Sequence, residues 1–78
     1  MRTNPTVELV VNLLPPRGRH ATIFRVLDAL GPGESMRLFV DHDPDPLRCQ
    51  LAVARPNGFV WAYEEEGPEL WQVVLGRR

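Results

Sequence analysis

The sequence contains no lysine, and all nine of its basic side chains are arginine. Codon usage is the favoured explanation of this bias, and a specific use of the guanidinium group is the alternative. The chain has ten acidic side chains, so the net charge is only −1 and there is no basic surplus. A basic stripe with interleaved aromatic side chains is also missing, which argues against a nucleic-acid partner.

Cysteine is nearly absent as well. Cys49 is the single cysteine, so no internal disulfide can form, and a reducing compartment is expected. The sequence has no apolar run long enough to span a bilayer and no signal-peptide pattern. We therefore expect a cytoplasmic protein without a membrane partner.

The length of 78 residues fits one small domain, which we place at residues 1–78. Hydrophobic residues make up 44% and charged residues 24% of the chain, an ordinary globular balance. After a loose start over residues 1–6, the apolar periodicity and the Pro/Gly turns predict six elements. In the order strand, helix, strand, helix, strand, strand, their ranges are 7–13, 19–30, 35–41, 46–54, 59–65 and 70–75.

A strand–helix–strand connection makes its two strands parallel, whereas the short link between the last two strands predicts a hairpin. The order β-α-β-α-β-β therefore predicts an α+β fold. It is a two-layer α/β sandwich, with two helices on one face of a four-stranded mixed sheet. Gly31 is expected to cap the first helix. The helix positions expected to face the core include Ile23, Leu27, Leu47, Leu51 and Ala54.

Polar residues mark the sheet face that the helices leave open. The strand phase that contains Trp61 and Val73 is apolar and is expected to face the helices. The opposite phase contains polar residues such as Glu8 and Arg37, yet four apolar residues share it, namely Val10, Phe39, Val60 and Val74. If these four form one patch, the open face predicts a protein partner or weak homodimer. A sheet edge is the alternative place for self-association.

The loops that follow the first two strands should meet at one edge of the sheet. In α/β folds this is the edge at which ligands usually bind. Two helices also begin there and present free N–H groups. Basic groups at this edge predict a site for an anion or another polar ligand, with the candidates Arg17, Arg19, His20 and Arg48.

The same edge offers nitrogen and oxygen ligands for a metal such as zinc, iron or manganese. The metal candidates are His20, His42, Asp41 and Asp43, with Asp45 nearby. A structural interpretation competes with both sites, because Asp43 or Asp45 can cap a helix and the aspartates can pair with the arginines. No cofactor is required by the sequence.

Four segments carry a resemblance to a known family. They are Pro15-Pro16-Arg17-Gly18-Arg19-His20, Leu27 to Glu34, Asp41-His42-Asp43-Pro44 followed by Pro46-Leu47, and Glu65-Glu66-Gly67-Pro68-Glu69-Leu70-Trp71. Together they resemble the uncharacterised bacterial family called domain of unknown function 2249, over nearly the whole chain after Asn4. That family is more distantly similar to the sulfur carriers of the TusA/SirA type, which implies the β-α-β-α-β-β fold.

The resemblance also bears on function. Members of the family occur alone or beside hemerythrin-like and other small redox-related domains, which implies a redox or metal-related partner. The sulfur carriers use a cysteine in a Cys-Pro-x-Pro motif at the start of the first helix. Here Arg19, His20 and Ala21 occupy that stretch, and Cys49 lies on the second helix. This departure argues against persulfide carriage and leaves sulfur relay as a minor alternative.

Catalytic machinery has no clear signature, since Ser35 lies in no nucleophile elbow and His42–Asp43 has no adjoining nucleophile. We therefore expect a small cytoplasmic binding or interaction module, accessory to a redox or metal-related partner, rather than an enzyme. The alternative is a metal- or anion-binding protein that uses His20, His42 and the aspartates.

Overall fold

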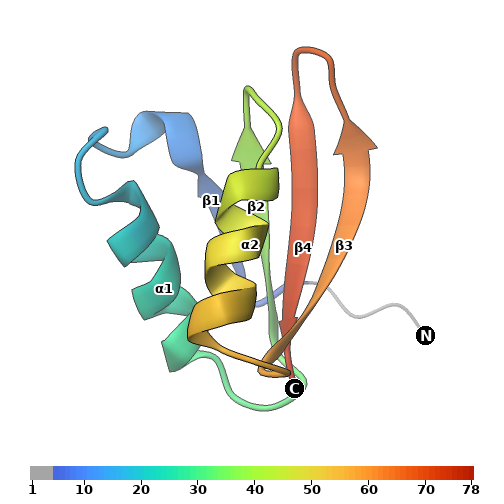
Figure 1. Cartoon of the computed structure of the whole chain (residues 1–78). Helices are drawn as coiled ribbons and strands as arrows, with labels where there is room; N and C mark the ends of the chain where they lie inside the picture. Colours follow the sequence, from blue (N-terminus) through green and yellow to red (C-terminus); the bar gives the residue numbers. More distant parts are fainter. Residues whose placement is uncertain (1–4) are drawn as a thin grey trace.

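The computed structural model describes residues 5–78, so the first four positions of the predicted loose start lie outside the described residues. Two α-helices, one 3-10 helix and four strands follow one another along this part of the chain (Figure 1). In chain order they are β1 (Val7–Val10), η1 (Val11–Leu13), α1 (Arg19–Ala29), β2 (Ser35–Val40), α2 (Asp45–Ala54), β3 (Phe59–Glu66) and β4 (Trp71–Arg77).

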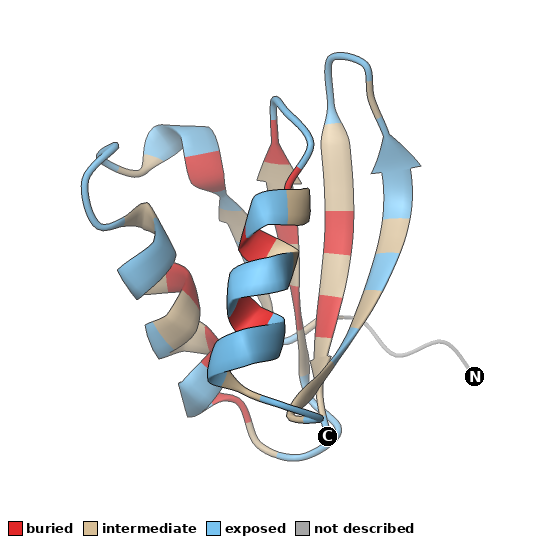
Figure 2. Ribbon diagram, viewed as in Figure 1, coloured by how far each residue is buried: buried red, intermediate tan, exposed pale blue. Residues whose placement is uncertain are grey.

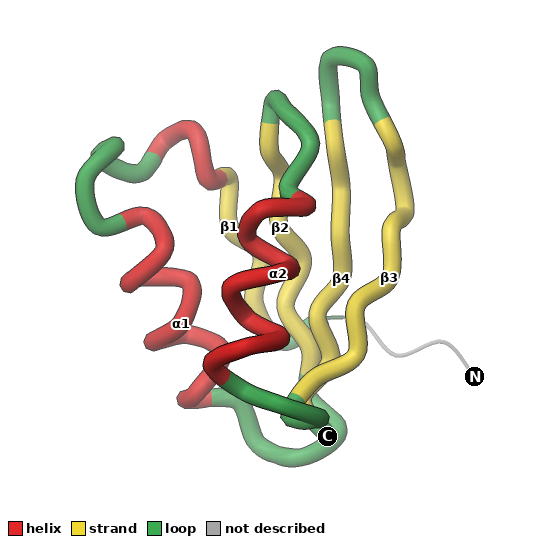
Figure 3. The backbone as a smooth tube through the Cα atoms, in the orientation of Figure 1, coloured by secondary structure: helices red, strands yellow, loops and turns green. Residues whose placement is uncertain are grey.

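The four strands form one mixed sheet in the order β1-β2-β4-β3. β1 pairs with β2 in parallel, as the helical crossover between them requires, and Val10 lies opposite Phe39. β4 is antiparallel to both β2 and β3, and the β3–β4 hairpin is confirmed. Figure 3 shows both helices on one side of the sheet. The predicted α+β fold, with two helices and a four-stranded mixed sheet, is therefore confirmed.

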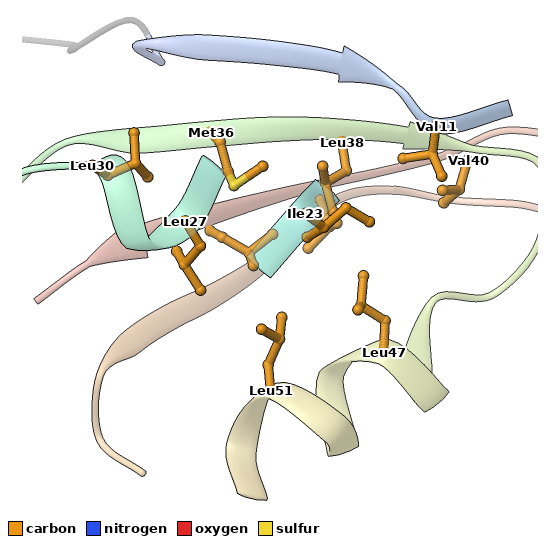
Figure 4. Close-up of a cluster of buried hydrophobic side chains, with 11 residues drawn as sticks. Val11, Ile23, Leu27, Leu30, Met36, Leu38, Val40, Leu47 and Leu51 are labelled. Atoms are coloured by element: carbon orange, nitrogen blue, oxygen red, sulfur yellow. The ribbon is translucent and has the colours of Figure 1, made fainter. Parts of the chain in front are cut away.

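The core lies between the helices and the central strands (Figure 4). Ile23 and Leu27 of α1 and Leu47 and Leu51 of α2 are buried, as the helical period predicts. Ala54 is exposed, so its predicted core position is wrong: it is the last residue of α2. The buried hydrophobic side chains are Val11, Ile23, Leu27, Leu30, Met36, Leu38, Val40, Leu47, Leu51, Val73 and Leu75.

The first strand is shorter than predicted. It ends at Val10, and Val11–Leu13 forms one turn of 3-10 helix that closes with a hydrogen bond from the Leu14 N–H to the Val11 carbonyl. The pairing with β2 ends at the same point, with Val10 opposite Phe39, although β2 continues to Val40. The turn lets Val11 enter the core at 4% exposure while Leu13 stays 81% exposed.

The end of α1 also differs from the prediction. The C-cap is Leu30 in an extended conformation, and Gly31 does not adopt the left-handed backbone that a glycine cap uses. The Glu34 carboxylate accepts the Gly31 N–H at 2.5 Å, so a side chain completes the turn. Gly33, with φ of 82°, takes the left-handed position instead.

The aromatic side of the sheet is only partly covered. Figure 2 shows α2 in front of β2, while β4 and β3 lie to its side. Phe59, Trp61 and Tyr63 of β3 pack against the core as predicted, yet each stays half-buried. Trp61 and Trp71 both meet the Tyr63 ring edge-on, at centroid distances of 5.9 and 6.2 Å.

The opposite face of the sheet carries an ion-pair network. The Arg37 guanidinium contacts the carboxylates of Glu8 and Glu64, each at 2.7 Å. These hydrogen bonds, the stronger to Glu64, hold the pKa of Arg37 above its ordinary value. The network shares the face with four apolar residues, of which Val10 and Val60 are exposed and Phe39 and Val74 half-buried. Dimerisation through this open face stays a prediction.

No helix within residues 5–78 combines the length and the apolar character that crossing a membrane demands.

Candidate functional site

A pocket of about 390 Å³ opens where the loops after β1 and β2 meet, as the topology predicts. Its floor is apolar, because the core residues Val11, Ile23, Val40 and Leu47 reach it from four elements. The starts of α1 and α2 form its walls. The other lining residues are Pro16, Gly18, Arg19, His20, Ala21, His42, Asp43, Pro44 and Pro46.

Four of the predicted site residues line this pocket, and the first two come from the start of α1. The Arg19 guanidinium donates hydrogen bonds to the carbonyls of Leu14 at 3.0 Å and Asn12 at 3.2 Å. These bonds fix the loop before α1 and place the positive charge at the pocket wall. His20 Nδ1 lies 2.7 Å from Gln50 Oε1 of α2, so this contact ties the two helices together.

The other two come from the loop after β2. His42 Nδ1 lies 2.8 Å from Asp41 Oδ1, and about two-thirds of each side chain is exposed. The hydrogen bond from His42 holds the pKa of Asp41 below its ordinary value. Asp43 Oδ1 accepts the Asp45 N–H at 3.0 Å, and the Tyr63 hydroxyl donates to the same oxygen at 3.4 Å. The predicted capping role of Asp43 is thus seen directly, although the formal N-cap is Pro44.

Arg17 and Arg48 do not line the pocket. Arg17 is exposed in the loop before α1. Arg48 pairs with Asp45 one turn earlier on α2, at 2.8 Å, and the hydrogen bond to Asp45 raises the pKa of Arg48 above its ordinary value. The interpretation of a self-satisfied network is therefore correct for Asp45 and Arg48.

The residues predicted as metal ligands do not form a cluster. Within residues 5–78 no three side chains of His, Cys, Asp or Glu gather in a way that holds a metal ion. His20 contacts Gln50 and His42 contacts its neighbour Asp41, so the two rings have separate partners. Metal binding by His20, His42, Asp41 and Asp43 stays a prediction without a ligand cluster in its support.

The two helix starts at the pocket differ in charge. α1 begins after Gly18, which has φ of 83° and no side chain, and its first turn contains no acidic residue. Its first N–H groups therefore receive no side-chain cap. α2 has Asp45 in its first turn and Asp43 bonded at its start. The positive end of the α1 dipole is left uncompensated, whereas that of α2 is balanced.

Sequence reasoning missed the pocket's apolar half. Val11, Val40 and Leu47 read as core residues, and nothing in their spacing shows that they also border a cavity. Pro16, Pro44 and Pro46 also line the pocket, but in the sequence these prolines indicate only turns and a helix start.

Cys49 is exposed on α2, as predicted, and does not line the pocket. Its Sγ lies 3.9 Å from an Asp45 carboxylate oxygen. The position gives sulfur transfer no support.

A family model described as "Uncharacterized conserved protein (DUF2249)" matches residues 8–77, which is almost the entire chain. This protein belongs to the DUF2249 family. No curated protein and no solved structure matches the chain. Membership therefore confirms the resemblance to the family, while the likeness of DUF2249 to the TusA/SirA sulfur carriers stays a prediction. The pocket and its two helix starts lie inside the matched range.

Proposed function

We propose that this DUF2249 domain is a binding module for small organic anions and that the ligand occupies the pocket at the start of α1. In this proposal the domain is a cytoplasmic accessory to a redox or metal-related partner and performs no chemistry itself. The observation that carries the proposal is the combination of a buried apolar floor with an uncapped helix start in one cavity.

The size and lining of the pocket favour a small molecule. A volume of about 390 Å³ lies in the range of ligand sites, which are mostly apolar with a few polar groups that set orientation. Val11, Val40 and Leu47 offer methyl groups to the apolar body of a ligand. A bare inorganic ion would leave this floor unused, so an organic ligand is favoured.

Charge decides which end of the ligand goes where. The start of α1 offers backbone N–H groups, the positive end of the helix dipole and the Arg19 guanidinium. Asp43 on the opposite wall is expected to repel an anion. We therefore place the carboxylate or phosphate of the ligand beside Gly18, Arg19 and His20, with its apolar end on the floor.

The lining favours binding over nucleophilic catalysis. None of the thirteen lining residues is a serine, threonine, cysteine or lysine, the residue types that most often form covalent intermediates. His42 and Asp41 form an exposed pair at the rim and have no nucleophile in the pocket to activate.

Hexanoate is a suitable probe, because it joins a carboxylate to a flexible apolar tail. The experiment follows the amide signals of the ¹⁵N-labelled chain while hexanoate, acetate or hexanol is added. The proposal predicts saturable shifts at Gly18, Arg19, His20 and Ala21 with hexanoate. Acetate lacks the tail and should bind at least about tenfold more weakly, given roughly 0.8 kcal/mol per buried methylene. Hexanol keeps the tail but lacks the charge, so it should also bind more weakly because it gains nothing from the helix dipole or the guanidinium.

The three probes separate the alternatives. If acetate binds as well as hexanoate, the site is a plain anion site and the apolar floor has no role. If hexanol binds as well, the charge of α1 has no role. If none of the three shifts these amides in a saturable way, the proposed function is wrong.

A further inference from the structure

The free edge of the sheet at β3 is unusually suited to pair with another strand. Within residues 5–78, β3 neighbours only β4, so its other side has no partner strand. The opposite edge strand, β1, has four residues, whereas β3 has eight. Proteins commonly protect edges with short strands, lysine, proline or inward-facing charge. Residues 59–63 of β3 have none of these features.

The hydrogen-bond pattern shows which backbone groups face outward. The Arg78 N–H donates to the Gly58 carbonyl, which places Gly58 on the β4 side of the ladder. Backbone direction alternates along an antiparallel pair, so Val60 and Ala62 also turn toward β4. The N–H and carbonyl groups of Phe59, Trp61 and Tyr63 therefore point to the free edge, where the Phe59 carbonyl already accepts one hydrogen bond, from Arg78 Nε at 3.3 Å.

The edge is self-complementary in shape. When two copies of β3 run antiparallel with Trp61 opposite the partner's Trp61, Phe59 lies opposite the partner's Tyr63. All three outward-facing residues then meet an outward-facing residue, as the ladder requires. The cross-strand pairs are aromatic, a combination that stabilises sheets. The register shift between Tyr63 and Glu65 ends the regular stretch and confines pairing to residues 59–63.

The edge is self-complementary in charge as well. Its C-terminal end is acidic through Glu65 and Glu66. At the other end, the Arg78 guanidinium reaches the Phe59 carbonyl at 3.3 Å, so a positive charge lies beside the edge there. Antiparallel pairing brings the acidic end of one copy to the basic end of the other. A parallel arrangement would place like charges together.

From this geometry we propose that β3 pairs antiparallel with β3 of a second copy. The result is a two-fold symmetric homodimer with one continuous eight-stranded sheet, twice the four strands of one chain. The interface is separate from the ligand pocket, since no β3 residue lines that pocket. It also differs from a dimer through the open sheet face.

Charge pairs across the edge provide the test. In the proposed register, Val60 lies opposite the partner's Ala62 on the open face, and both side chains are exposed. Val60→Lys combined with Ala62→Lys sets like charges opposite each other at two symmetric places. Val60→Lys combined with Ala62→Glu sets opposite charges there. Cross-strand pairs of about 0.2–1 kcal/mol each predict dissociation constants that differ by about tenfold between these variants.

Sedimentation measures the result. The wild-type chain should show twice its 8.9 kDa mass at high micromolar concentration, the Lys/Lys variant should dissociate, and the Lys/Glu variant should stay dimeric. Val10→Lys, on β1, should leave the edge dimer intact but would break a dimer through the open face. A monomeric wild-type chain, equal masses for the two double variants, or dissociation by Val10→Lys would overturn the proposal.

Amide hydrogen exchange of the wild-type chain keeps the test independent of how the variants fold. Dilution should speed exchange at Phe59, Trp61 and Tyr63 and leave Val60 and Ala62 unchanged, because the latter two bond to β4. Exchange at Phe59, Trp61 and Tyr63 that is independent of concentration would contradict the edge pairing.

Discussion

A carboxylate placed at Ala21 should occupy the positive field that we assign to the ligand's anionic group. Ala21 is the third residue of α1, lines the pocket and is exposed, so Ala21→Asp adds a charge without disturbing the core. The new carboxylate would lie about 4 Å from a bound anion, where like charges repel by roughly 1–4 kcal/mol between the dielectric limits of water and the protein surface. Hexanoate should therefore bind at least about fivefold more weakly.

The fold should tolerate this change. An acidic residue in the first turn gains about 0.3–1 kcal/mol from the helix dipole, and aspartate costs up to about 0.7 kcal/mol in helix propensity relative to alanine. The free energy of unfolding in urea should therefore change by less than about 1 kcal/mol. Ala21→Asn is the matched control, because it has nearly the same shape and no charge.

Amide-detected titration with hexanoate compares the wild-type chain, Ala21→Asp and Ala21→Asn. The electrostatic reasoning predicts weak binding for the aspartate variant and near wild-type binding for the asparagine variant. Equal loss in both variants would mean that shape matters and charge does not. Unchanged binding in the aspartate variant would refute the assignment of the anionic group to the start of α1.

The remaining predictions concern stability. Leu51→Ala removes a fully buried side chain and should lower the free energy of unfolding by about 2–5 kcal/mol, whereas Val53→Ala, at an 83% exposed position on the same helix, should change it little; urea denaturation checks both. The hydrogen bond from Arg55 holds the pKa of Asp28 below its ordinary value, so this pair stabilises the fold above the ordinary carboxyl pKa and loses its effect as the pH falls through the folded-state pKa. Arg55→Gln should therefore lower the thermal stability at neutral pH, and the variant should lose less stability than the wild-type chain when the pH is lowered. The same dependence of thermal stability on pH in both proteins would contradict this.

The sequence predicted burial best in elements that have one face on the core and the other in water. Met36, Leu38 and Val40 alternate with half-buried neighbours, and the structure buries all three. Ile23 and Leu27, or Leu47 and Leu51, lie one helical turn apart and both pairs reach the core. Such positions follow from the sequence because one face of each element meets the core and the other meets water.

The ends of β1 and α1 were harder to predict, because they depend on contacts with residues distant in the sequence. The run from Val7 to Leu13 is rich in valine, yet the strand stops at Val10, opposite Phe39, although β2 itself continues to Val40. Glu34 completes the α1 turn in place of a glycine cap, a contact that depends on the path of the following loop. Local propensity contains no record of either constraint.

The candidate site was likewise predicted in part. Topology placed the loops after β1 and β2 at one edge, and Arg19, His20, His42 and Asp43 do meet there. Arg48 pairs with Asp45 and does not line the pocket. The apolar floor could not be predicted from the sequence, because its residues also belong to the core. A pocket is a gap between elements, so its shape depends on how far apart the helices pack.

The measurement that tests the ligand site most directly is the location of bound hexanoate by nuclear Overhauser effects between its methyl protons and the methyl groups of the ¹³C-labelled chain. Our account predicts contacts with Val11, Val40 and Leu47, while the amides of Gly18 and Arg19 shift with the carboxylate. Saturable binding whose contacts lie elsewhere, for example at the exposed Val53 or Val60, would contradict it.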